Sequence, residues 1–108
     1  MNKGEIVLVP FPFSELKNIK VRPAVVICET KDRYKDIVVS AISSVIPLSL
    51  NRNEIIVHPD SINKLRTISV IKVDRMVTIR KDIIIAKLGK LDAKTFKIFR
   101  ESFLSLID

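Results

Sequence analysis

The sequence predicts a mainly β fold: a small, strongly bent antiparallel barrel with one amphipathic helix at the C-terminus. Short runs rich in β-branched residues recur along most of the chain, separated by polar or proline-containing segments. No alternation of strands and helices is visible, and only two glycines occur in 108 residues. The hydrophobic period lengthens to that of a helix only near the C-terminus.

Two strands are predicted near the N-terminus, over residues 6–9 and 21–27, because both runs are rich in valine and isoleucine. Pro10 and Pro12 remove backbone donors, so they are expected to end the first strand. The polar segment 14–20 is too short for a useful helix, so the two strands are predicted to form a hairpin with a long loop.

Further strands are predicted wherever an apolar run returns, at residues 37–43, 54–58, 67–73 and 77–79. Residues 74–76 are expected to turn or bulge, and Lys81–Asp82 to turn. Residues 83–88 are expected to be a strand or irregular extended chain, because three successive isoleucines are poor helix formers.

The C-terminal segment predicts an amphipathic helix that lies on the sheet or barrel. Gly89 is expected to break the chain, and Asp92 is a good N-cap. Lys94, Lys97 and Arg100 occupy the polar face. Apolar residues recur on the other face at three- and four-residue spacing: Phe96, Phe99, Phe103, Leu106 and Ile107.

Composition indicates one domain spanning residues 1–108, because 47% hydrophobic residues suffice for a single core. Lys and Arg outnumber Asp and Glu by 19 to 12, and the resulting charge of +7 favours nucleic acid as partner, although solubility alone also explains it. With Cys28 as the only cysteine and no signal-peptide pattern, we expect a cytoplasmic protein. No apolar run approaches the roughly 18 residues of a membrane span, so no membrane partner is expected.

Several chemistries are disfavoured by what the chain lacks. His58 is the only histidine, so an acid–base pair of two histidines within one chain is impossible. The carboxylates are scattered singly without the spacing of metal ligands, so no metal site is predicted. No glycine-rich nucleotide-binding motif and no nucleophile elbow occurs, and we therefore predict no cofactor.

RNA cleavage fits the remaining residue types, because the 2′-hydroxyl of RNA supplies the nucleophile and the protein only has to orient the phosphate, stabilise its charge and move protons. Arg22, held extended by Pro23, can donate a bidentate fork to a phosphate. Ser43 or Ser44, at the end of the third predicted strand, can supply a hydroxyl, although serines there are commonly structural hydrogen bonders.

The segments GEIVLVPFPF, KVRPAVVI, VVSAIS and SVIKVDRMVTIRKD, followed by KLGKLD and a helix, together resemble the MazF/PemK family of type II toxin–antitoxin toxins. The resemblance covers nearly the whole chain in the family's order. It implies an SH3-like barrel with a C-terminal helix, a homodimer, and metal-independent endoribonuclease activity on single-stranded RNA such as mRNA. It also implies a cognate antitoxin protein that blocks the RNA groove.

By this resemblance, Arg22 and Ser43 are the expected catalytic pair. Arg22 would stabilise the transition-state charge of the phosphate, and Ser43 stands where the family usually has a threonine. The products would carry a 2′,3′-cyclic phosphate and a 5′-hydroxyl. Four further residues are expected to bind RNA: Ser14, Lys17, Lys20 and Ser44.

The chain departs from the family pattern at two places. Lys17 stands near the position of a glutamate that many members carry, and Val77 stands where an arginine is common. Two alternatives therefore stay open. The first is a CcdB-like toxin that poisons a topoisomerase through residues near the C-terminus, and the second is a non-catalytic barrel that binds nucleic acid.

Overall fold

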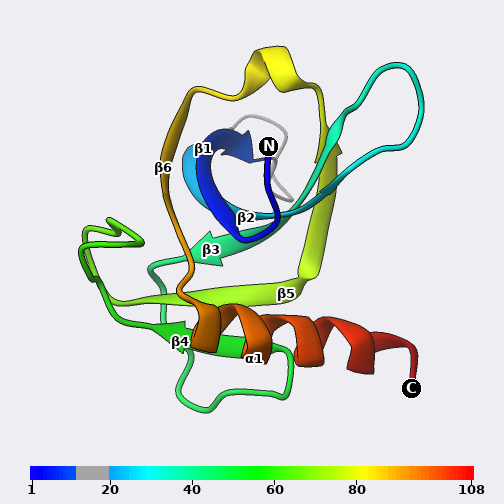
Figure 1. Ribbon diagram of the computed structural model, residues 1–108. Coiled ribbons are helices and arrows are strands. Elements are labelled where there is room, and N and C mark those ends of the chain that lie inside the picture. Colours follow the sequence, from blue (N-terminus) through cyan, green and yellow to red (C-terminus); the bar gives the residue numbers. More distant parts are fainter. Residues whose placement is uncertain (12–19) are drawn as a thin grey trace.

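The computed structural model describes residues 1–11 and 20–108 of the protein (Figure 1). In this part of the chain, six strands precede a C-terminal helix, and two short 3-10 turns complete the regular structure. The elements are β1 (Glu5–Phe11), β2 (Lys20–Glu29), β3 (Ile37–Ser43), β4 (Glu54–Val57), β5 (Ser69–Ile79), η1 (Lys81–Ile83), β6 (Ala86–Lys90), α1 (Ala93–Leu104) and η2 (Ser105–Ile107).

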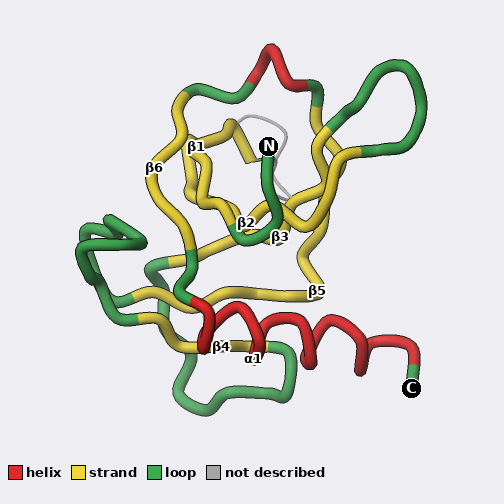
Figure 2. Tube along the Cα trace, in the orientation of Figure 1, coloured by secondary structure: helices red, strands yellow, loops and turns green. Residues whose placement is uncertain are grey.

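The six strands form one antiparallel sheet in the order β4-β5-β3-β2-β1-β6. The sheet curls into a half-barrel, and α1 packs against β4 and β5 (Figures 1 and 2). The edge strands β4 and β6 approach each other through the segment after β4, because the N–H of Lys90 donates to the carbonyl of Ile62 at 3.1 Å. The predicted class, a bent antiparallel β fold with a C-terminal helix, is confirmed.

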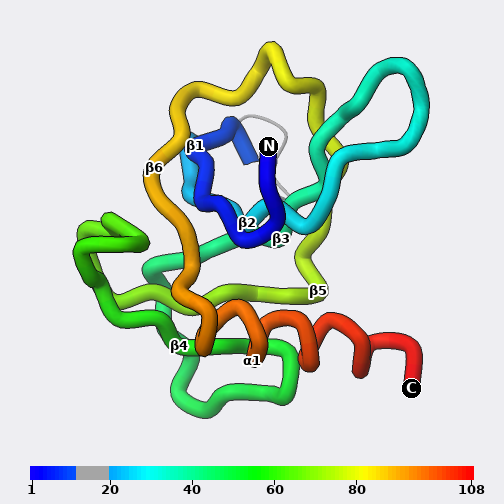
Figure 3. The backbone as a smooth tube through the Cα atoms, viewed as in Figure 1, coloured from blue at the N-terminus to red at the C-terminus, as the bar shows by residue number. Residues whose placement is uncertain are grey.

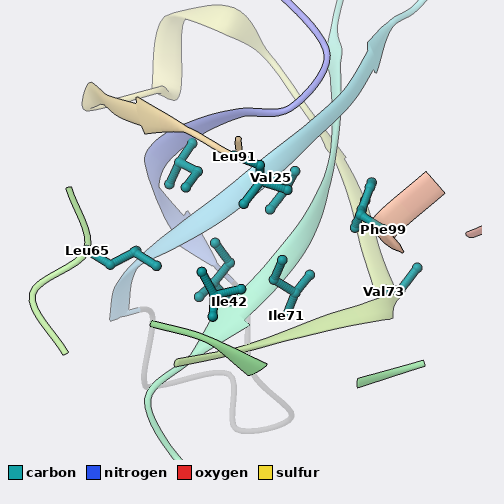
Figure 4. Close-up of a cluster of buried hydrophobic side chains, with 9 residues drawn as sticks. Val25, Ile42, Leu65, Ile71, Val73, Leu91 and Phe99 are labelled. Carbon is teal, nitrogen blue, oxygen red and sulfur yellow. The ribbon is translucent and has the colours of Figure 1, made fainter. Parts of the chain in front are cut away.

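Two clusters of buried side chains occupy the two faces of the curled sheet, because successive side chains of a strand point to opposite faces. The first cluster (Figure 4) includes Phe99 of α1 and contains Ile6, Val25, Ile42, Val57, Leu65, Ile71, Val73, Leu91 and Phe99. The second contains Val7, Val9, Phe11, Ala24, Val26, Ile37, Val39 and Ile79. The neighbours Ile6 and Val7 belong to different clusters, so β1 separates the two cores.

The helix begins where it was predicted. The Asp92 carboxylate accepts the N–H of Thr95 at 2.7 Å and so caps the first turn of α1. Phe99 is buried in the first cluster, and Phe96 and Phe103 pack against its edge. No helix in the described residues is long and apolar enough to cross a membrane.

Strand β1 was expected to end at Pro10. Instead it continues to Phe11, which pairs with Lys20. The Leu8 carbonyl faces β6, so Pro10, two residues further along, faces the same side. The β1–β6 pairing already ends at Leu8 and Ala86. The missing N–H of Pro10 therefore costs the sheet no hydrogen bond.

Residues 67–73 and 77–79 were expected to form two strands, but one strand, β5, runs through both. The turn or bulge expected at residues 74–76 is a bulge that begins one residue earlier: Ser40 opposes Met76, whereas Ala41 opposes Lys72. Three residues, 73–75, are thereby left between the two registers. The backbone stays extended through the bulge, which is why the strand is not interrupted.

Gly89 was expected to break the chain. Instead it lies inside β6 and pairs with Ile6. A Cβ at this position would lie 2.4 Å from the carbonyl oxygen of Ile62 and 2.6 Å from that of Asn63. Gly89 is therefore required for the close approach of a neighbouring backbone. The strand expected at 83–88 is correct in type but begins at Ala86, after the 3-10 turn η1.

Candidate active site

Arg22 on β2 and Ser43 on β3 are brought together by the register of their strands. Ala24 pairs with Ala41, so Arg22 and Ser43, each two residues further outward, come opposite one another on the same face. Both line one cavity of about 220 Å³, here called the Arg22 cavity. The structure thus brings together the two residues that the sequence analysis assigned to catalysis.

The remaining described lining of the Arg22 cavity comes from β1, β3 and β5: Phe11, Ala41, Ile42, Lys72 and Arg75. Phe11 is 8% exposed and belongs to the second cluster, so it forms a fixed apolar wall. Arg22, Lys72 and Arg75 place three cationic groups around one small volume. Such convergence favours an anionic ligand.

Lys72 is positioned by its neighbours on both sides. It opposes Ala41 on β3 and Glu54 on β4, and its Nζ lies 3.3 Å from Glu54 Oε2. The pKa of the Glu54 carboxyl is lowered, first by the N–H of Asn51, bonded at 3.0 Å, and also by Lys72, which together outweigh the opposing effect of burial. Glu54 is therefore an anion at neutral pH that holds the Lys72 ammonium at the cavity.

Arg75 reaches the Arg22 cavity from the bulge of β5. The three residues 73–75 between the two registers project Arg75 beside Lys72, although regular pairing would set the two residues on opposite faces. Sequence reasoning missed both Lys72 and Arg75. The expected bulge at 74–76 was the available signal for Arg75, whereas Lys72 depends on the register between β3 and β5.

The hydroxyl of Ser43 has a defined orientation. Its Oγ accepts the N–H of Val45 at 3.1 Å, so the hydroxyl hydrogen can be directed to a ligand. Ser44 does not line the Arg22 cavity. It is exposed and lines a second hollow of about 490 Å³, the Leu88 groove, whose lining also includes Arg22, Arg66, Thr67 and Leu88. Arg22 therefore lines both the hollow that contains Ser43 and the hollow that contains Ser44.

The other predicted RNA-binding residues have different outcomes. Lys20 is exposed at the start of β2, and it is not among the described residues that line the Arg22 cavity or the Leu88 groove. Ser14 and Lys17 lie outside the described residues. His58 is exposed, and its carbonyl accepts Asn63 Nδ2 at 2.9 Å. Within residues 1–11 and 20–108, no three His, Cys, Asp or Glu side chains gather in a way that could hold a metal ion.

Comparisons with known proteins agree with this architecture. The family model described as PemK-like, MazF-like toxin of type II toxin-antitoxin system matches residues 2–106. Among solved structures, toxin MazF-mt6 of Mycobacterium tuberculosis is similar to this chain, with a TM-score of 0.66 and 18% sequence identity. The superposition covers 94% of this chain and 96% of that one, and at this identity it establishes a shared fold. No curated protein matches significantly in sequence. Because the family model spans nearly the whole chain, the chain belongs to the PemK-like, MazF-like toxins of type II toxin–antitoxin systems.

Proposed function

We propose that this toxin is an endoribonuclease that cleaves single-stranded RNA, mRNA included, without a metal ion. The observation that carries the proposal is the convergence of a guanidinium, a hydroxyl and two further cations on the Arg22 cavity. RNA supplies its own nucleophile, so this set of groups is sufficient in kind for phosphate chemistry.

In the proposed reaction, the 2′-oxygen attacks the adjacent phosphorus and the bond from phosphorus to the 5′-oxygen breaks. The proton of the 2′-hydroxyl is transferred, in net terms, to the departing 5′-oxygen. The products carry a 2′,3′-cyclic phosphate and a 5′-hydroxyl. The atoms balance without water, metal or cofactor entering the step.

Arg22 is assigned the central role, since its planar fork can donate two parallel hydrogen bonds to the phosphate oxygens as charge develops on them. Ser43, oriented by the Val45 N–H, donates a hydrogen bond to the same phosphate. Lys72 and Arg75 raise the local positive potential without being required to move. Lys20 and Ser44 contact the RNA next to this phosphate, and the same role is assigned to Ser14 and Lys17, which lie outside the described residues.

We further propose that the toxin acts in the cytoplasm as a homodimer and is neutralised by a cognate antitoxin. Exposed apolar side chains gather in the segment after β3, where Val45 is 72% exposed and Leu48 is fully exposed. Surfaces of this kind favour contact with another protein chain. The net charge of +7 favours an acidic antitoxin.

The direct test is to incubate the purified protein with a long RNA in EDTA, beside two single variants. Arg22→Ala removes the cavity guanidinium, whereas Arg100→Ala removes an exposed arginine on α1 and serves as the matched control. We expect the parent and Arg100→Ala to cut, and Arg22→Ala to lose at least about 100-fold in rate. A parent that does not cut, or an Arg22→Ala variant that cuts equally well, would disprove the proposal.

A CcdB-like toxin that binds a protein target is the second candidate, because Ile107 is 89% exposed and Leu104 is 45% exposed at the end of the chain. It predicts no RNA cleavage, with loss of toxicity on Ile107→Ser and retention of toxicity on Arg22→Ala. A non-catalytic RNA-binding barrel predicts binding without product. The EDTA assay distinguishes both from the leading proposal.

A further inference from the structure

Three hollows on the surface adjoin one another through shared lining residues. The Arg22 cavity shares Arg22 and Ile42 with the Leu88 groove. The Leu88 groove shares Leu88 with a third hollow of about 590 Å³, here called the lysine hollow, which lies between the N-terminal residues, β6 and the segment after β4. The three hollows therefore adjoin in series, starting at the proposed catalytic cavity, and are here together called the track.

The far end of the track carries a strong positive charge. The lysine hollow is lined by Lys3, Lys64, Lys87 and Lys90, and by Glu5 as its only described acidic residue. Glu5 is buried and forms an ion pair with Lys87. Among the described ion pairs, none involves the other three lysines. Within the described residues, these three ammonium groups therefore have no acidic partner.

The middle of the track has a different character. The Leu88 groove has an apolar floor that includes Leu8, Pro23, Leu65 and Leu88, with Arg66 at its rim. Apolar side chains beside a cation suit a nucleobase, which can pack there while its phosphates remain outside. The track thus alternates a cationic cavity, an apolar groove and a cationic hollow.

The segment 58–66 that carries Lys64 and Arg66 is held in one shape by Asn63, which is 2% exposed. Asn63 Oδ1 accepts the N–H groups of Asp60 and Leu65, both at 3.0 Å, and Asn63 Nδ2 donates to the carbonyl of His58 at 2.9 Å. These bonds satisfy a buried amide and tie the whole segment together.

Two further contacts fix this segment against the barrel. Leu65 inserts into the first hydrophobic cluster (Figure 4). The carbonyl of Ile62 accepts a hydrogen bond from the N–H of Lys90 in β6, so the segment 58–66, green in Figure 3, lies beside β6. Lys64 lies between the buried residues Asn63 and Leu65 with a φ of 56°, a left-handed conformation that non-glycine residues adopt at a cost. The backbone accepts this cost while the Lys64 side chain lies exposed at the lysine hollow.

We propose that this track binds the RNA flank that leaves the Arg22 cavity, with one nucleobase on the apolar floor of the Leu88 groove and successive phosphates at Arg66, Lys64 and the other lysines of the hollow. The inference rests on the proposed function, since it takes the scissile phosphate to be at Arg22. RNA is favoured over an acidic protein segment because the track begins at the cavity proposed to take the scissile phosphate, so the neighbouring phosphates of the same strand can reach its cationic residues.

The test uses the double variant Lys64→Asn/Arg66→Gln, which removes two charges. Asparagine tolerates the left-handed backbone at position 64, so the segment should keep its shape. The matched control, Lys94→Gln/Arg100→Gln, removes one lysine and one arginine from the exposed face of α1. Folding of both variants is checked by urea denaturation and their oligomeric state by light scattering.

Binding is measured with a long and a short oligonucleotide that are fully 2′-O-methylated and so cannot be cleaved by attack of the 2′-oxygen. We expect the track variant to bind the long probe about tenfold more weakly, with a salt slope reduced by about 0.7 for each of two lost phosphate contacts, about 1.4 in all. Its affinity for a short probe that fills only the Arg22 cavity should equal that of the parent. The control should match the parent on both probes.

Cleavage provides a second readout: kcat/KM of the track variant should fall on long RNA and stay unchanged on short RNA. A track variant that matches the control on the long probe overturns the inference, as does equal weakening on both probes. Polyglutamate serves as an acidic-protein probe: if the track variant loses polyglutamate binding but keeps RNA binding, the track binds an acidic protein. If the oligomeric state of the track variant changes while RNA binding is intact, the track is a contact between subunits. Because the probes are not cleaved, these outcomes stay distinct from a failure of the proposed activity, in which the parent itself cuts no RNA.

Discussion

The hydroxyl of Ser40 on β3 donates a hydrogen bond of 2.9 Å to the carbonyl oxygen of Val73 on β5. Val73 is the first residue of the β5 bulge, and its N–H donates to the carbonyl of Asn53 at 2.9 Å. The N–H and the carbonyl of Val73, which has no partner in the β3–β5 pairing, are therefore both satisfied. The bulge has a defined shape for this reason, and Arg75, which it carries, is held at the Arg22 cavity.

Ser40→Ala should lower the free energy of unfolding by about 1–3 kcal/mol, because Ser40 is fully buried and its loss leaves the Val73 carbonyl without its hydroxyl donor. Urea denaturation measures the change. The control is Ser102→Ala, which removes the exposed bond from Ser102 Oγ to the carbonyl of Arg52 and should cost less than about 0.5 kcal/mol. Equal costs for the two variants would contradict the role given to Ser40.

Replacing Ser43 tests the hydroxyl of the proposed catalytic pair. Ser43→Ala should lower kcat for RNA cleavage by about 100-fold or more, since it removes a donor aimed at the developing charge. Ser43→Thr keeps the hydroxyl and restricts χ1, so its kcat should be equal to or above that of the parent. The variants are compared in single-turnover cleavage assays, and an alanine variant as active as the threonine variant would remove Ser43 from the mechanism.

Gly89→Ala should destabilise the protein by about 1–3 kcal/mol, because the new Cβ would lie 2.4 Å from the Ile62 carbonyl oxygen and one backbone would have to move. The hydrogen bond from the Lys90 N–H to Ile62 should weaken, and hydrogen exchange at the Lys90 amide should accelerate. Lys97→Ala, which removes an exposed lysine of α1, serves as the control for exchange at the Lys90 amide. If the Lys90 amide is equally protected in Gly89→Ala and parent, the close approach is not needed.

The Asp92 cap makes part of the stability depend on pH. The N–H of Thr95 lowers the pKa of the Asp92 carboxyl below 3.8, its ordinary value. A carboxyl with a lowered pKa stabilises the folded state above its unfolded pKa, so this contribution is complete above about pH 4 and is lost as the pH falls through the folded pKa. Asp92→Asn keeps the capping acceptor without a titrating charge.

Below pH 4, the urea midpoint of Asp92→Asn should therefore fall less steeply with pH than that of the parent. Asp92→Ala, which lacks any capping acceptor, should have a lower midpoint than both at neutral pH. Parallel pH profiles for parent and Asp92→Asn would show that the ionised cap contributes nothing to acid sensitivity.

Local features of the fold were predictable from the sequence because their causes lie within a few residues. The run at 37–43 matches β3, and Asp92 caps α1, since β-branched content and N-cap chemistry act locally. Gly89 was misread for the complementary reason. A glycine that breaks a chain and a glycine that admits a distant backbone look the same in one sequence, and the partner here, Ile62, lies far away in the chain.

The sequence by itself determined that the chain is a β protein with a helical end, and it pointed to Arg22 and Ser43 as a pair suited to phosphate chemistry. Only the tertiary structure decided which other groups meet them. Lys72 joins the cavity through the β3–β5 register and Arg75 through a bulge, and the lysine hollow forms where residues from the two edges of the sheet come together. Register and closure depend on contacts between distant residues, so no local pattern in the sequence records them.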